Sequence, residues 1–205
     1  MDRMSKKRFN ELNVYLSKKL VEICKTKKIH KINNIVWYSD EKLFLKGIIS
    51  LGINEEKNVL MCSYIEKIKP MWIDNLLWDI MNMSDNEKNA QSLRANGAFT
   101  YNGYQTDFKS TVVETWSEME IEKCICNYLF DFINTTQNVT IEQLNTKIFE
   151  NEKEDELYKL LYLINNKEYY DAIEHLKSMK YNYFINKGKS LREYSQEYCV
   201  KKINW

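Results

Sequence analysis

The chain has 205 residues, of which 44% are hydrophobic, 13% aromatic and 29% charged. This length is enough for one well-buried core with or without a smaller appendage, and the aromatic content argues against a disordered chain. Its 30 basic and 29 acidic residues give a formal net charge of +1, so the overall charge does not demand a polyanionic partner.

Charge is unevenly distributed along the chain. Counting signs gives roughly +7 for residues 1–31, roughly −9 for 114–175 and roughly +5 from 176 onward. We expect these segments to form solvated faces that partly neutralise each other. The alternative is a charged docking surface.

Targeting and cofactor signals are weak. The N-terminus shows no signal peptide, and no later run approaches about 20 apolar residues. The five cysteines show no C-x-x-C spacing, so we expect neither a zinc site nor a disulfide framework. These features favour a cytoplasmic protein without a cofactor and without a membrane span.

The first half of the chain predicts a helix followed by a sheet. Apolar residues recur at three and four from about residue 6 to 28, which indicates an amphipathic helix. Residues 35–39, 43–53 and 59–68 are rich in β-branched and aromatic residues and are separated by polar turns. They predict an antiparallel meander of three strands.

The middle of the chain contains clear start and stop signals. Pro70 suits the first position of a helix that runs to about Met83. Ser84 and Glu87 form a capping-box pattern for a short helix, which Gly97 can end in the left-handed conformation. The pair at 102–103, Asn-Gly between aromatic flanks, predicts a β-hairpin that adds two strands.

The rest of the chain is predicted to be helical. A regular apolar stripe after residue 117 indicates a helix that covers the sheet. Segments 152–164 and 168–179 predict a helix hairpin, and Ser190 with Glu193 caps the last helix. We therefore expect an α+β fold with an antiparallel sheet of about five strands and a C-terminal helical annex, divided into residues 1–138 and 139–205.

Catalytic motifs are absent from the sequence. Neither His30 nor His175 lies in a metal-ligand pattern, and no nucleophile elbow or glycine-rich phosphate loop occurs. A metal-dependent enzyme acting on phosphodiesters is the alternative, with Asp107, Glu114 and Glu66 as its ligands. Charged residues on the outer face of an antiparallel strand are usually only solvated, so we favour a non-enzymatic protein.

A third hypothesis is a nucleic-acid-binding accessory protein. The lysines of the N-terminal helix could contact phosphates. They are scattered around the polar face, however, and no aromatic residues suited to base stacking are interleaved with them. We do not favour this hypothesis.

The best candidates for partner binding lie between residues 74 and 104. On a helical wheel Trp78 falls outside the apolar arc, one turn after Asp74. Trp78 either packs beneath a second element or anchors a partner, and we favour packing because an exposed tryptophan promotes aggregation. Arg94 could bind a partner's carboxylate, and Tyr101 and Tyr104 flank the Asn-Gly pair.

The segment L-R-A-N-G-A-F at 93–99, together with the order of elements over residues 5–135, resembles small cytosolic bacterial α+β proteins of uncharacterised families. Some of these are similar to immunity proteins encoded beside polymorphic toxins. The resemblance implies a stoichiometric binding protein of immunity or inhibitor type, with another protein as its partner and no cofactor.

Overall fold

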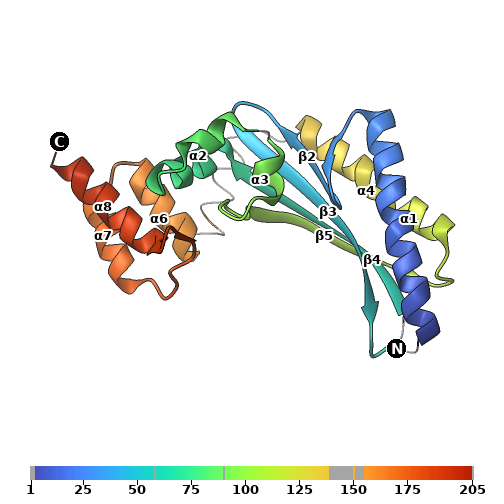
Figure 1. Cartoon of the computed structure of the whole chain (residues 1–205). Helices are drawn as coiled ribbons and strands as arrows, with labels where there is room; N and C mark the ends of the chain where they lie inside the picture. Colours follow the sequence, from blue (N-terminus) through green and yellow to red (C-terminus); the bar gives the residue numbers. More distant parts are fainter. Residues whose placement is uncertain (1–2, 58, 90, 139–149, 151–154, 205) are drawn as a thin grey trace. The chain divides into compact units, whose positions relative to one another are not determined.

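The computed structural model describes residues 3–57, 59–89, 91–138, 150 and 155–204. The chain divides into two compact units (Figure 1). Unit 1 comprises residues 1–68 and 105–140, and unit 2 comprises residues 69–104 and 141–205. The predicted boundary at 138–139 lies close to one junction, but residues 69–104, which we assigned to the first domain, cluster with the C-terminal helices.

Unit 1 is built on a sheet with the strand order β1-β2-β3-β4-β5. The strands are β1 (His30–Ile32), β2 (Ile35–Ser39), β3 (Leu43–Asn54), β4 (Val59–Pro70) and β5 (Tyr104–Val113). Strand β2 pairs antiparallel with β1, where His30 lies opposite Trp37, and with β3, where Val36 lies opposite Gly47. The predicted α+β class with a five-stranded antiparallel sheet is confirmed.

Two helices of unit 1, α1 (Arg3–Lys27) and α4 (Glu118–Asn138), lie side by side along the sheet (Figure 1). The apolar stripes that predicted these helices are buried, as Leu16 of α1 and Ile125 of α4 show. Gly47 of β3 permits close packing, since a Cβ atom there would lie 2.7 Å from the ring of Tyr64 and 3.2 Å from that of Phe132 on α4. One face of the sheet therefore forms the core of unit 1 with α4.

The opposite charges of α1 and α4 meet within unit 1. The Lys19 ammonium lies 3.0 Å from the Glu122 carboxylate, and the Tyr15 hydroxyl donates to the same carboxylate. Arg8 lies 3.9 Å from Glu118. The basic N-terminal segment and the start of the acidic segment thus partly neutralise each other, as we expected.

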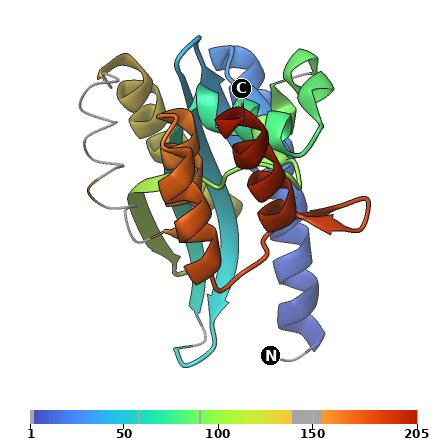
Figure 2. The ribbon, with the colours of Figure 1, turned by 90° about the vertical axis from the view of Figure 1, so that its left-hand side faces the viewer.

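Unit 2 is mainly helical. Its elements are α2 (Met71–Ile80), the 3₁₀ helix η1 (Ser84–Lys88), α3 (Ser92–Asn96), α6 (Glu156–Asn165), α7 (Tyr169–Ser178), β6 (Ile185–Asn186), β7 (Lys189–Ser190) and α8 (Leu191–Ile203). Figure 2 shows α6, α7 and α8 packed beside one another, with the β6–β7 ribbon projecting before α8. The predicted C-terminal helices, including the capping box of Ser190 and Glu193, are confirmed.

Three predictions in the middle of the chain are wrong, and one of them is the capping box of Ser84 and Glu87, since η1 has no side-chain cap. The Asn102-Gly103 hairpin does not form, because residues 97–103 contain no strand and β5 begins only at Tyr104. The reason is that the backbone N–H of Tyr101 donates to the Asp74 side chain, and its carbonyl accepts from Lys69. Gly97 ends α3 with φ −77°, so it is not left-handed.

None of the helices in the described part of the chain is both long and apolar enough to cross a membrane.

Candidate functional site

A buried group of charges lies at the centre of unit 2. The Lys69 ammonium lies 2.7 Å from the Asp74 carboxylate, and the Arg94 guanidinium lies 3.5 Å from the same oxygen. The exposed fractions of Lys69, Asp74 and Arg94 are 1%, 0% and 4%. Burial lowers the pKa of Lys69, and the neighbouring Asp74 carboxylate opposes this shift. One carboxylate is therefore shared by two buried cations.

The backbone of distant segments closes this charge cluster. Lys69 donates to the carbonyl oxygens of Arg94 (3.0 Å) and Tyr101 (2.8 Å). Arg94 donates to the carbonyl of Met71 (3.3 Å) and to the side chain of Asn75 (2.5 Å). These bonds tie the end of β4 to α2, to α3 and to the segment that precedes β5.

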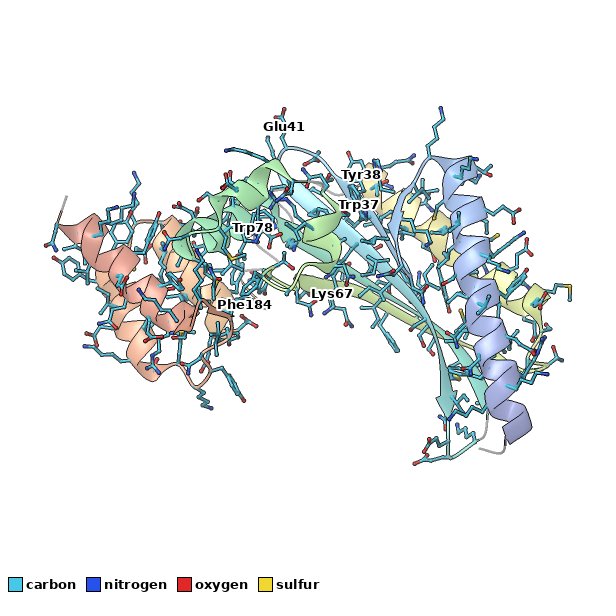
Figure 3. The ribbon with its side chains drawn as sticks, in the orientation of Figure 1. Trp37, Tyr38, Glu41, Lys67, Trp78 and Phe184 are labelled. Carbon is cyan, nitrogen blue, oxygen red and sulfur yellow. The ribbon has the colours of Figure 1, made fainter. Side chains whose placement is uncertain are left out.

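Trp78 belongs to the same buried cluster (Figure 3). The Arg94 guanidinium lies 4.5 Å from the centre of the Trp78 ring, a cation–π contact. The indole N–H donates to the carbonyl of Phe99 at 2.6 Å. Trp78 is 1% exposed, so the packing alternative is confirmed and the surface-anchor alternative does not hold in this conformation.

Four of the five predicted partner-binding residues, namely Asp74, Trp78, Arg94 and Tyr101, thus come together, but in the interior of unit 2. They position α2 and α3. Tyr104, the fifth, lies half-buried at the first position of β5. Sequence reasoning considered Lys69 only beside Glu66 in the metal-dependent alternative and did not predict its ion pair with Asp74. Its signal was a lysine directly before Pro70, at a point where the strand pattern still placed it in the sheet.

The alternative metal site does not assemble. Glu66 is 3% exposed and accepts hydrogen bonds from Tyr64 (2.7 Å) and Thr106 (2.7 Å). The Asp107 carboxylate pairs with Lys109 at 3.0 Å, and Glu114 is exposed in the turn after β5. Among the described residues, no group of three or more His, Cys, Asp or Glu side chains could hold a metal ion.

A cleft of about 550 Å³ lies between α2 and α8 in unit 2. It is lined by Asp79, Ile80, Asn82, Tyr194, Glu197, Tyr198, Lys201 and Lys202. On the α2 side of the cleft, Asp79 and Ile80 directly follow Trp78, a member of the buried cluster. The α8 side comes from residues spaced so that they share a helical face.

The cleft contains side chains that can donate hydrogen bonds, among them Tyr198, Lys201 and Lys202. Burial raises the pKa of Tyr198 to about 12, and the neighbouring Asp79 carboxylate adds to this shift. Tyr198 therefore stays protonated at neutral pH and acts as a donor. Lys202 lies 5.3 Å from the centre of the Tyr198 ring. Neither Lys201 nor Lys202 forms an ion pair with any residue that the structure describes.

The two acidic side chains of the cleft already have partners. Asp79 accepts from Ser84 (3.3 Å), and Glu197 forms an ion pair with Lys189. Within the described part of the chain, no carboxylate thus forms an ion pair with either ammonium group of the cleft. The cleft offers an aromatic wall and two ammonium groups that no ion pair occupies, which suits a ligand that carries a carboxylate or another anion.

Sequence reasoning did not identify this cleft. The helical pattern marked Tyr194 and Tyr198 only as apolar positions of the last helix, and it marked Asp79 only as a solvated carboxylate. The available signal was the i, i+4 spacing of the two tyrosines followed by two lysines. It could not show that the polar face of α2 lies opposite them, because the two helices are more than 100 residues apart.

Compared with known proteins, the chain matches no family model, and no curated protein or solved structure is significantly similar to it.

Proposed function

We propose that this protein is a non-enzymatic interaction module of immunity or inhibitor type, which binds another protein through the α2–α8 cleft. The observation that carries the proposal is the cleft itself, because its two ammonium groups and its aromatic wall suit the binding of a carboxylate. Among the described residues its lining contains no histidine and no cysteine, and the raised pKa of the half-buried Tyr198 keeps that phenol protonated at neutral pH. The partner would present an acidic segment, with a carboxylate near Lys201 and Lys202.

The buried charge cluster supports this proposal indirectly. Binding surfaces lose less entropy when the elements that carry them are already fixed. Asp74 and Trp78 fix α2 within unit 2, while the Ser190 cap fixes the start of α8. Both walls of the cleft are therefore built on rigid helices rather than on loops.

The experiment is co-expression of the chain with the product of each adjacent gene, followed by treatment with a carbodiimide that joins carboxylates directly to lysines. We expect a stable complex with one of these products and cross-links from Lys201 or Lys202 to an acidic segment of it. The double variant Lys201→Gln/Lys202→Gln should lose the cross-links and weaken the complex at least tenfold, as expected for the loss of two charge-assisted contacts.

The matched control is Lys27→Gln/Lys28→Gln, which makes the same charge change at two exposed adjacent lysines of unit 1. It should leave the complex intact. A complex that is equally stable with both double variants would exclude the cleft as the binding surface. Failure to form a complex with either neighbouring product would count against the immunity-type function.

A further inference from the structure

The last strand of the sheet, β5, has an open outer edge. It lies at the end of the strand order, and no other described strand pairs with its far side. It is ten residues long, and most of its side chains are exposed, including Phe108 (58%) and Val112 (44%). A long edge strand with exposed apolar side chains is a template for pairing with another strand.

The sequence of β5 is self-complementary around Phe108. Asp107 precedes Phe108 and Lys109 follows it. When two copies of the strand pair antiparallel with Phe108 opposite Phe108, Asp107 of each copy lies opposite Lys109 of the other. Opposite charges directly across an antiparallel pair attract, as do two aromatic rings. Both charged side chains are about 40% exposed and can therefore be reached by a second copy.

The backbone of β5 is compatible with this pairing. The N–H of Phe108 donates to the side chain of its neighbour Asp107 at 2.8 Å, as expected for a donor that faces away from β4. In the paired strands this N–H would bond to the Phe108 carbonyl of the second copy, and the Asp107 carboxylate would turn to Lys109 of that copy. Because residue pairs are then related by a two-fold axis, the contact is isologous and closes as a dimer.

The opposite edge of the sheet does not offer the same surface. β1 has only three residues, and it contacts α1. A sheet with one long open edge and one short edge forms a closed pair rather than a fibre.

From the open edge and its charge pattern we infer that two copies of this chain pair through β5, antiparallel and centred on Phe108, to form a homodimer. This inference does not depend on the α2–α8 cleft. It concerns an edge of unit 1 only.

The test is a charge swap measured by sedimentation over a range of protein concentrations. Asp107→Lys alone and Lys109→Asp alone each place like charges opposite each other twice in the dimer. Each should raise the dissociation constant of the dimer roughly tenfold to a hundredfold. The double variant Asp107→Lys/Lys109→Asp restores opposite charges and should regain most of the affinity.

Mixing the two single variants provides a sharper readout. In the mixed pair, the lysine introduced at position 107 of one chain lies opposite the aspartate introduced at position 109 of the other. The native Lys109 of the first chain lies opposite the native Asp107 of the second. Heterodimers should therefore form in a mixture of two variants that are each monomeric at the same concentration. Circular dichroism and thermal unfolding of each variant show whether it is folded, since Lys109 also pairs with both Asp107 and Asp131 within the chain.

The matched control is Asp85→Lys and Lys88→Asp on η1, an exposed pair in unit 2. These changes alter the net charge equally and should leave the dimer unaffected. A wild-type chain that remains monomeric at millimolar concentration would overturn the inference. So would a dimer that both single variants of β5 leave unchanged, or single variants that fail to associate when mixed.

Discussion

Asp74 is the residue on which the interior of unit 2 depends most. It is the counter-ion of both Lys69 and Arg94, and all three side chains are buried. Removing one member of a buried ion pair leaves an uncompensated charge, which destabilises a protein far more than the pair stabilises it. We expect Asp74→Asn to lower the free energy of unfolding by about 3–5 kcal/mol, measured by urea denaturation.

The control for this change is Asp85→Asn. The Asp85 side chain is 97% exposed and pairs with the exposed Lys88. Exposed ion pairs contribute little, so its loss should leave the urea midpoint nearly unchanged. Equal effects of the two variants would show that Asp74 is not the counter-ion of the buried cations.

The buried thiol of Cys199 is expected to make the free energy of unfolding depend on pH in the alkaline range. The side chain is fully buried, and burial raises the pKa of its thiol from 9.0 to about 11. Between these values the unfolded chain loses this proton while the folded chain keeps it, so the free energy of unfolding falls as pH rises. The contribution from this residue is up to about 3 kcal/mol over the interval.

Cys199→Ala should therefore flatten the dependence of the unfolding free energy on pH between 9 and 11, measured by denaturation at several pH values. Cys126 is the only exposed cysteine of the five, so Cys126→Ala is the matched control and should keep the slope of the parent chain. If Cys199→Ala has the slope of the control, the thiol does not couple folding to pH.

At the scale of single residues, the sequence pattern identified Trp78 and Asp74 as unusual but did not predict their roles. Trp78 and Asp74 stood out because they fall beside the apolar arc of their helix. Their burial depends on Arg94 and Lys69, which reach them from other parts of the chain. A periodic pattern within one helix contains no information about such partners.

At the scale of the elements, the starts of α8 and η1 share a capping-box pattern, but only one of them forms the cap. The pattern Ser-x-x-Glu occurs at 84–87, at the start of η1, and at 190–193, where Ser190 precedes α8. Ser190 and Glu193 form a complete capping box at the start of α8, whereas Ser84 forms no cap and donates to Asp79 instead. We expect Ser190→Ala to reduce the free energy of unfolding by about 1 kcal/mol, measured by thermal or urea denaturation.

Ser84→Ala provides the comparison, because it removes the same hydroxyl from the same pattern without removing a cap. Its effect should stay within about 0.5 kcal/mol. Similar losses for both serines would mean that the capping box of α8 contributes no more than an exposed hydroxyl.

Element prediction succeeded where the pattern was local and failed where a distant side chain intervened. The stripes of α1, α4 and α8 and the strands β2, β3 and β4 follow from periodicity alone. The Asn102-Gly103 hairpin has a strong local signal, yet Asp74 and Lys69 take the backbone groups of Tyr101 that a strand would use. A side chain 27 residues away thus overrides the turn preference.

For the whole molecule, the division into units is the property that the sequence did not reveal. The chain enters unit 2 after residue 68, leaves it after residue 104 and returns after residue 140. What joins 69–104 to the C-terminal helices is a set of contacts between distant residues. Tyr101 lies against Tyr158, Phe99 lies against Phe184 (labelled in Figure 3), and Asn186 donates to the carbonyl of Met81.

The last prediction follows from this division and concerns a fragment of residues 1–138, the domain that the sequence suggested. The fragment keeps every described element of unit 1 but removes α6 and α8, which contact α2. Hydrogen exchange measured by mass spectrometry should show β3 and α1 protected as in the full chain, because their buried contacts remain within unit 1. The amides of Met71–Ile80 should exchange much faster, since an isolated ten-residue helix is marginal in water. Equal protection of α2 in the fragment and the full chain would instead place residues 69–104 with the first domain. Loss of protection in β3 would show that unit 1 cannot fold without unit 2.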